Sequence, residues 1–491
     1  MEPTALPLLW SVLPLIILLF LLVIKIYTSS PTGKRLPPGP WKLPLLGSLH
    51  HLLLSRHGDL PHRALQELSR KHGPLMLLHF GDVPTLVVSS AKAAREVLKT
   101  HDAAFASRHL TPTLDIFSRG PYGDLWRQLR RICLLELMSA RRVLSFRHIR
   151  EDEVAALIGY ITDECARSGG CGCTVVEIGQ LITRTVNDIV VRSAIGGRCP
   201  RRDEFLHVLD KSVKLSGAVR ETEQCNRKAR AIMDDFIRER VDGAGKSMED
   251  LLGVLLRVQE DGGEQCPLDL TTDIITTVVQ EMFVAGSETS STTVLHKAQE
   301  EVREELHGWS KLAEGDLAGG QLSYLSLVIR ETLRLHAPLP FLLPRQCREP
   351  CEVMGYHIPE GTKVLVNAWA LGRDDAYWED AEAFKPERFE ECSAAAMDFK
   401  GGHFEYLPFG SGKRMCPGVA LGLTNMELLL ASLLYHFDWE LPGGGRPDDL
   451  DMAEAFGMLD NNKNKRDKRN TDFYVETLAG ENHGTHGGVS L

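Results

Sequence analysis

The chain has 491 residues, of which 43% are hydrophobic and 25% are charged; this composition is typical of a folded globular protein and excludes a largely disordered or fibrous one. The 56 lysines and arginines against 66 aspartates and glutamates give a formal net charge of −10, which argues against a protein that coats nucleic acid. The eleven cysteines are scattered and form no CxxC pair, so neither a disulfide scaffold nor a zinc domain is expected.

An apolar run stands near the N-terminus. Residues 3–24 carry no charge and no histidine, and a helix of this length crosses the roughly 30 Å hydrocarbon core of a bilayer. Residues 1–30 are therefore predicted to be a membrane anchor; a cleaved signal peptide is the alternative, but the run is longer than a signal's apolar region and lacks a small-residue cleavage pattern. Basic residues follow the run and only Glu2 precedes it, so the positive-inside rule predicts a single span with the rest of the chain in the cytosol.

A proline-rich stretch, Pro37-Pro38-Gly39-Pro40, comes next. Prolines stiffen the chain and prevent helix continuation, so residues 31–41 are expected to be a hinge that sets the exit angle from the bilayer; a plain linker is the alternative. No long Gly/Ser-rich or Pro-rich stretch interrupts residues 60–455. We therefore expect one large domain over residues 42–458.

Residues 270–294 are predicted to form a helix that begins with capping residues. Gly286 lies in its middle, where glycine costs about 1 kcal/mol relative to alanine. Close approach of a ligand would explain that residue, and the acid Glu288 and the hydroxyl of Thr289 follow at once. Taken alone, this AGSET segment could equally be a packing surface between helices.

Glu331 and Arg334 form a charged motif on a later predicted helix. They are three residues apart, so they are neighbours on one face and can pair. An exposed helix pair, worth roughly tenths of a kcal/mol, is the alternative.

The most specific segment is PFGSGKRMCPG at residues 408–418, which runs into the apolar-periodic stretch 419–437. Pro417 suits the first position of a helix, so Cys416 is expected near a helix N-terminus, where free N–H groups and the positive end of the dipole favour a thiolate. The three glycines permit close approaches that a side chain would block, so a flat macrocycle could lie against the loop. A phosphate-binding P-loop is excluded, because its first glycine and its Ser/Thr are missing.

The segment resembles the haem-binding signature FxxGxRxCxG of the cytochrome P450 family, with Phe409, Gly412, Arg414, Cys416 and Gly418 at the matching positions. By that resemblance Cys416 is the axial thiolate of a haem b iron and pushes electron density toward O–O cleavage. The resemblance also implies a mainly α fold with small β-sheets (α+β), the cytochrome P450 fold, preceded by an N-terminal transmembrane helix.

Two of the other motifs gain a role from the resemblance. The AGSET segment is similar to the family's oxygen-activating segment, in which Glu288 and Thr289 would organise the two protons that dioxygen reduction needs. Glu331 and Arg334 look like the family's ExxR pair, with Arg388 in its PERF partner. The implied role is a buried network that braces the haem pocket, structural rather than catalytic, in which removal of one partner costs about 3–5 kcal/mol.

Arginines are the implied haem propionate partners. Trp126 and Arg130 match the family's WxxxR segment, and Arg345 and Arg414 are the other two expected partners, because the guanidinium fork suits a carboxylate. Together with the loop residues they make up the predicted haem-binding set: Trp126, Arg130, Arg345, Phe409, Gly412, Arg414 and Gly418. Exposed arginines nearby form either a basic face for an acidic electron donor or an ordinary solvated surface: Arg127, Arg131, Arg141 and Arg142.

Among known relatives the chain looks most like the plant microsomal group that oxidises terpenoids and other specialised (secondary) metabolites. This implies a monooxygenase of the endoplasmic reticulum membrane that inserts one atom of O2 into a small lipophilic substrate. No GxGxxG segment supplies a nicotinamide site, so electrons are expected from NADPH through NADPH-cytochrome P450 reductase. One alternative is a relative that rearranges peroxides without a donor, against which the intact AGSET segment speaks.

The chain departs from the family pattern at four places. It is short near Pro121, Gly217 and Thr293, where relatives carry part of a substrate loop, the helices that guard substrate entry and the end of the oxygen-activating helix. Residues 459–491 form a polar tail, predicted to be disordered, where relatives close with a β-hairpin. These departures predict a truncated or mis-predicted gene product, or else a genuine adaptation. A catalytically impaired haem-binding membrane protein is therefore the alternative function.

Overall fold

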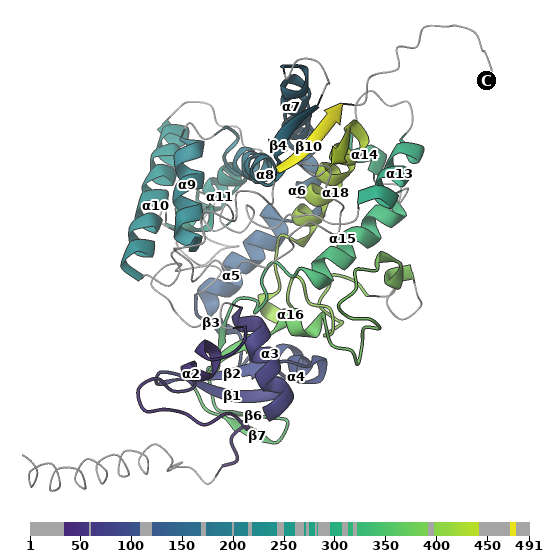
Figure 1. The fold of residues 1–491 in the computed structure, drawn as a ribbon. Coiled ribbons are helices and arrows are strands. Elements are labelled where there is room, and N and C mark those ends of the chain that lie inside the picture. Colours follow the sequence, from purple (N-terminus) through teal and green to yellow (C-terminus); the bar gives the residue numbers. More distant parts are fainter. Residues whose placement is uncertain are drawn as a thin grey trace, which may run out of the picture. The chain divides into compact units, whose positions relative to one another are not determined.

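The computed structural model describes most of the chain (Figure 1): residues 34–57, 60–108, 120–167, 173–198, 201–214, 219–242, 250–260, 270–271, 274–279, 282, 295–306, 313–317, 322–390, 397–440 and 472–477. The predicted membrane anchor, Glu288 and Thr289 lie outside the described residues. So do the chain at Gly217 and Thr293 and most of the polar tail. The chain divides into two compact units; unit 1 comprises residues 1–109, 339–382 and 398–415, and unit 2 comprises residues 110–338, 383–397 and 416–491.

Unit 1 is built on a five-stranded mixed sheet of order β1-β2-β8-β5-β3, in which only β2 and β8 run parallel. The strands are β1 Leu75–Phe80, β2 Val83–Val88, β3 Ser107–Arg108, β5 Arg345–Gln346 and β8 Lys363–Val366, and a separate hairpin joins β6 Cys351–Val353 to β7 Tyr356–Ile358. The unit's helices are α2 Leu49–Leu53, α3 Pro61–His72, α4 Ala91–Arg95, α16 Ala368–Leu371 and the single turns η1 Glu96–Thr100 and η4 Gly412–Arg414.

Alternate residues of β1 and β2 enter two different cores. Met76 and Leu78 point toward α3, whose Leu65 and Leu68 join the same cluster. Leu75 lies on the other face, in a cluster that also holds residues of α4 and η1. Because strand side chains alternate between faces, a run of apolar residues such as Leu75-Met76-Leu77-Leu78 is what a strand covered on both sides requires.

The proline-rich stretch is docked on this sheet. The Pro38 carbonyl accepts a hydrogen bond from the Leu77 N–H at 2.9 Å, and the Arg35 carbonyl accepts one from the His357 N–H at 2.8 Å. A side chain at Gly39 would collide with the Leu77 carbonyl. Strand β1 therefore approaches the backbone of residue 39 too closely for any residue other than glycine. Residues 35–39 are therefore fixed to unit 1 by backbone hydrogen bonds and are not a free linker.

Unit 2 is mostly helical (Figure 1). Its helices are α5 Asp124–Ile132, η2 Cys133–Leu137, α6 Ala140–Ser145, α7 Arg147–Arg167, α8 Ile178–Ile195, α9 Arg202–Lys214, α10 Val219–Asp242, α11 Leu251–Glu260, α13 Leu295–Glu305, α14 Glu314–Leu317, α15 Ser323–Leu335, η3 Pro386–Glu390 and α18 Val419–His436. Of the helix predicted at 270–294, the described residues 274–279 and 282 are helical, whereas the described residues 270–271 are not. The predicted combination of many helices with small sheets is confirmed.

Helix α18 matches the apolar stretch predicted at 419–437 to within one residue. Among the described residues it is the one helix long and apolar enough to cross a membrane. It packs against α7, α13 and α15 within unit 2, and Leu428, Leu429 and Leu434 are each at most 3% exposed. These contacts are those of a core helix.

Part of the tail predicted to be disordered is a strand. Residues Asp472–Thr477 form β10, the middle strand of a three-stranded antiparallel sheet between β4 Cys173–Glu177 and β9 Phe437–Glu440. The disorder prediction is therefore wrong for these six residues. The signal was present, because Phe473-Tyr474-Val475 is a strand-forming triplet, but the polar residues around it outweighed it.

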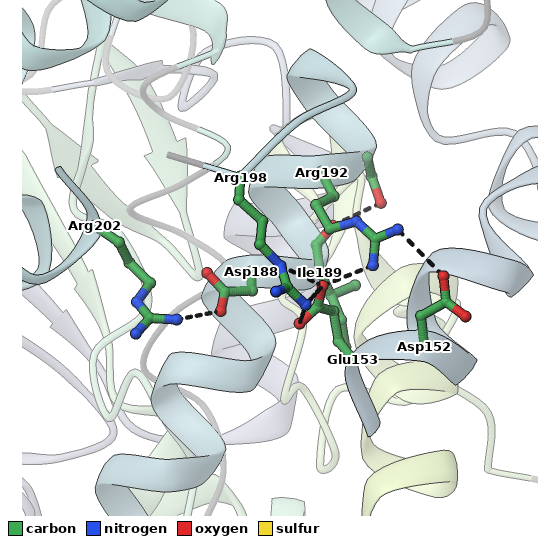
Figure 2. Close-up of polar contacts among 8 residues, drawn as sticks. Asp152, Glu153, Asp188, Ile189, Arg192, Arg198 and Arg202 are labelled. Carbon is green, nitrogen blue, oxygen red and sulfur yellow. Dashed lines mark hydrogen bonds and ion pairs between the residues drawn. The ribbon is translucent and has the colours of Figure 1, made fainter. Parts of the chain in front are cut away.

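A charged network joins α7, α8 and the start of α9 (Figure 2). The Glu153 carboxylate is 4% exposed and accepts hydrogen bonds from Arg192 at 2.6 Å and Arg198 at 2.8 Å. Asp188 of α8 pairs with Arg202 of α9 at 2.7 Å. Burial raises the pKa of Asp188, and the Arg202 guanidinium offsets part of that rise. The network supplies the polar contacts by which α7 and α8 meet.

The substitution Glu153→Gln is expected to lower the free energy of unfolding by about 2–3 kcal/mol, because charge-assisted hydrogen bonds to a buried carboxylate are lost. The control is Asp152→Asn on the next residue, which is 55% exposed and also contacts Arg192; it should change the same quantity by less than about 1 kcal/mol. Urea unfolding followed by circular dichroism measures both. An equal decrease in the free energy of unfolding in the two variants would contradict the larger contribution of Glu153 to stability.

Candidate functional site

Cys416 lies just before the first turn of α18. The helix begins at Val419 with Gly418 as its N-cap, two residues later than Pro417 suggested. Burial raises the pKa of the Cys416 thiol, while the Gly418 N–H and the charge of Arg130 lower it to a smaller extent. The expected position at a helix N-terminus is confirmed, and the Gly418 N–H lowers the pKa of the thiol as that position predicts, while burial acts in the opposite direction.

The sulfur environment fits a metal ligand. The thiol is partly buried, and the Gly418 N–H and the charge of Arg130 both favour its ionised form. A bound metal ion supplies a further positive charge and deprotonates a coordinating thiol outright. The residues around Cys416 therefore fit a haem iron better than they fit a free thiolate.

Arg130 of α5 is half-buried and faces the cysteine. Burial lowers its pKa, and the nearby Cys133 and Cys416 raise it. Within the described part of the chain no carboxylate pairs with it. One turn earlier Trp126 is 5% exposed, with its ring 5.3 Å from that of Tyr122. A half-buried guanidinium without a carboxylate suits an anionic group such as a haem propionate.

Arg345 and Arg414 lie in unit 1, and both are buried. Arg345 of β5 forms an ion pair with Asp102 at 3.1 Å and donates to the Ser411 carbonyl at 2.7 Å. Burial lowers the pKa of Arg345, and Asp102 raises it in part. The Arg414 Nε donates to the Ala106 carbonyl at 2.6 Å. Both arginines are thus positioned by the protein itself.

Asp102 is a site residue that the sequence did not reveal. Besides Arg345 it accepts a hydrogen bond from the Lys413 N–H at 2.8 Å. Gly412 has a φ of +71°, and a Cβ there would collide with the Leu98 carbonyl and crowd the Asp102 carboxylate. Glycine at 412 is therefore required both by its backbone angle and by this contact. No local pattern around Asp102 could have predicted a partner so far along the chain.

The ExxR pair is buried, as predicted. Glu331 and Arg334 of α15 are 0% exposed and pair at 2.7 Å. Arg388 of η3 joins the same carboxylate at 3.0 Å, and the Lys385 N–H donates to it at 2.8 Å. Both arginines also donate to the Ala383 carbonyl at 3.1 Å. The exposed-pair alternative is wrong.

The predicted residues thus fall into three groups. The first group belongs to unit 2 and consists of Arg130, Trp126, Cys416 and Gly418. The second group is the ExxR network, Glu331, Arg334 and Arg388, which also belongs to unit 2. Phe409, Gly412, Arg345 and Arg414 belong to unit 1, where the Phe409 ring contacts that of Phe399 at 5.5 Å between centroids.

Comparison with known proteins decides the family. Residues 37–465 match the protein-family model described as Cytochrome P450. The chain belongs to the cytochrome P450 family. This P450 is 47% identical to zealexin A1 synthase of Zea mays over 468 residues, which takes in 87% of this chain and 90% of the relative. It is 44% identical to premnaspirodiene oxygenase of Hyoscyamus muticus, with 88% and 91% covered.

A solved structure shows the same fold. It is a zebra fish cytochrome P450 with abiraterone, and it superposes with a TM-score of 0.69 at 24% identity, covering 85% of this chain and 99% of that one. The predicted P450 fold is confirmed. The protein is a haem-thiolate monooxygenase whose prosthetic group is haem b, and it uses O2, a redox partner and a lipophilic substrate.

Replacement of Glu331 by glutamine is expected to destabilise the P450 by about 3–5 kcal/mol, because two buried guanidinium groups lose their carboxylate. The exposed Glu390 of the neighbouring η3 provides the control variant Glu390→Gln, which should stay within about 0.5 kcal/mol of wild type. Thermal unfolding and the haem-to-protein absorbance ratio are the measurements. A Glu331→Gln protein with unchanged stability would show that the network does not brace unit 2.

Proposed function

We propose that Cys416 is the axial haem ligand of a P450 that oxidises a terpenoid or another small secondary metabolite at the endoplasmic reticulum membrane. One observation carries the assignment: Cys416 is partly buried just before α18, within reach of the positive charge of Arg130, a half-buried arginine that no described carboxylate neutralises. A sulfur and a cation placed in this way match the iron and a propionate of one haem group.

The other predicted site residues would each have a separate role in binding haem or in catalysis. Arg130, Arg345 and Arg414 would donate N–H groups to the propionates, Trp126 would pack beside them, and Phe409, Gly412 and Gly418 would line the loop against the ring. Haem, when bound, supplies the activation of dioxygen. Glu288 and Thr289, which lie outside the described residues, would hold and pass the protons. Glu331, Arg334 and Arg388 keep unit 2 in shape.

The relatives' names support the substrate class. Premnaspirodiene oxygenase is named for the oxygenation of a diene hydrocarbon, and zealexin A1 synthase is 47% identical over most of its length. An apolar substrate of that kind is held mainly by shape and apolar contact. The carbon that is oxidised would depend on the side chains that line the substrate pocket.

A P450 without turnover is the second candidate, and the length of the alignment favours it. The alignment with zealexin A1 synthase runs over 468 residues but takes in only 87% of the 491 residues here, which is about 427. The relative therefore has roughly 40 residues in the aligned stretch that this chain lacks. That difference supports the proposal of shortened segments, and substrate-dependent NADPH consumption in the presence of reductase separates an active enzyme from an inactive one.

The Cys416→Ala variant is expected to lose the long-wavelength Soret band that wild type shows when it is reduced and exposed to carbon monoxide, because no other ligand supplies the thiolate. Wild type should bind one haem per chain with that band. The control Cys165→Ala changes a buried cysteine of α7, and this variant should keep the long-wavelength Soret band. An unchanged spectrum in Cys416→Ala, or an imidazole-type band in wild type, rejects the ligand assignment whether or not the enzyme turns over.

Electrons would come from NADPH-cytochrome P450 reductase. The arginines of α5 and α6 would form the surface to which the reductase binds. Arg131 and Arg141 are exposed. Arg127 is occupied by Asp124, and the Arg142 Nε donates to the Glu136 carbonyl at 3.1 Å. Two exposed cations, one on α5 and one on α6, suit an acidic donor, whose approach they would accelerate at low salt.

Membrane attachment is supported by an apolar surface next to the docked proline stretch. Its side chains are between 51% and 83% exposed: Trp41, Leu45, Leu46, Leu53 and Leu54. An exposed cluster of this kind marks an interaction surface. We infer that it rests on the bilayer that residues 1–30 would span, with the haem domain in the cytosol.

The fluorescence of Trp41, taken as the difference between wild type and Trp41→Phe, is expected to be quenched by brominated lipids when the full chain is in vesicles, because the indole would lie among lipid chains. The control is the difference between wild type and Trp369→Phe, since Trp369 is 4% exposed and should not respond. An unquenched Trp41 would place this surface in water.

A further inference from the structure

Two cysteines that take no part in the haem site touch each other in unit 1. Cys347 follows β5 and Cys351 begins β6, and their Sγ atoms are 4.0 Å apart. The three residues between them, 348–350, are exposed. A partner for each sulfur is thus already in van der Waals contact, and solvent reaches the loop that joins them.

The backbones of both cysteines are anchored. The Cys347 N–H donates to the Thr362 carbonyl at 2.9 Å, and its carbonyl accepts from the Gly361 N–H at 2.8 Å. Cys351 pairs with Ile358 across the β6–β7 hairpin. A disulfide bond is about 2.05 Å long, so the sulfurs must close by about 2 Å. Rotation of the two side chains and adjustment of the exposed loop can supply that movement without disturbing either anchor.

The two thiols differ in access and in acidity. Cys347 is 1% exposed, whereas Cys351 is partly exposed. The hydrogen bond between the sulfurs lowers the pKa of Cys351 and raises that of Cys347. The Cys347 Sγ also lies 3.0 Å from the Glu349 carbonyl, so its single proton has two alternative acceptors, that carbonyl and the Cys351 sulfur. An oxidant would therefore meet Cys351 first, with Cys347 behind it.

We propose that Cys347 and Cys351 form a peroxide-reactive dithiol that closes to a reversible intramolecular disulfide. The Cys351 thiolate attacks one oxygen of hydrogen peroxide, the O–O bond breaks, and a sulfenic acid and hydroxide result. The Cys347 sulfur then attacks the Cys351 sulfur, the S–S bond forms, and the sulfenic hydroxyl leaves as water with the Cys347 proton. Two thiols lose two electrons in total, and one peroxide becomes two waters.

The disulfide would tie the end of β5 to the start of β6. Strand β5 carries Arg345, which Asp102 and the Ser411 carbonyl hold independently of the cysteines. Oxidation should therefore leave Arg345 in place, and the structural change should be confined to the loop between β5 and β6. A thiol reductant would cleave the disulfide, which distinguishes disulfide formation from the irreversible overoxidation of a single cysteine.

The test uses the full-length holoprotein, reduced, freed of reductant, treated with hydrogen peroxide and then alkylated. Trypsin cleaves after Arg348, between the two cysteines, so a disulfide appears in mass spectrometry as two linked peptides. We expect these linked peptides after peroxide and their loss on treatment with dithiothreitol. Peroxide that leaves both thiols open to alkylation would overturn the proposal, and so would linkage of either cysteine to a different one.

Variants separate the two roles. In Cys347→Ser, Cys351 has no resolving partner, so its sulfenic acid should accumulate and be trapped by dimedone. In Cys351→Ser, the buried Cys347 should stay reduced. The control Cys225→Ser changes a buried cysteine of α10 and should keep the linked peptides. Equal dimedone trapping at Cys351 in wild type and Cys347→Ser would show that Cys347 does not resolve it; the linked peptides of wild type decide the matter even if a variant fails to fold.

Discussion

The central constraint on this protein is the position of one cysteine sulfur just before the first turn of its core helix. Cys416 lies at the start of α18, with one backbone N–H and one guanidinium to stabilise a negative charge, and these do not offset the loss of solvent. A metal ion that binds the sulfur favours its ionisation, as in other sites where metal binding releases a proton. The proposed role of Cys416 as the haem ligand is consistent with this position.

The arginines of the site illustrate how a protein keeps buried cations in place. Arg345 has its own carboxylate in Asp102, and Arg414 has a carbonyl. Arg130 has neither in the described structure, so it is the arginine that benefits most from an anionic ligand. Under the proposed function the two kinds of arginine would serve different purposes: the first two are positioned by the protein itself, whereas the third would contribute binding energy through the ligand.

The Glu331 network solves the opposite problem, since it buries an anion. One carboxylate accepts hydrogen bonds from Arg334, Arg388 and the Lys385 N–H. The network holds one carboxylate and two guanidinium groups, and each of the three has hydrogen-bond partners, since both arginines also donate to the Ala383 carbonyl. The spacing of Glu331 and Arg334 was visible in the sequence, but the burial that separates a structural network from a surface pair was not.

The sequence by itself determined the family, the core helix at 419–436 and the positions of the motif residues, because each of these is written in contiguous residues and in a regular periodicity. Only the tertiary structure decided that burial raises the pKa of the Cys416 thiol, that Asp102 holds Arg345 across 243 positions of chain, and that residues 472–477 complete a sheet with strands from two distant segments. Burial, ion pairing and strand pairing depend on what the rest of the fold brings alongside a residue, and no local pattern records that.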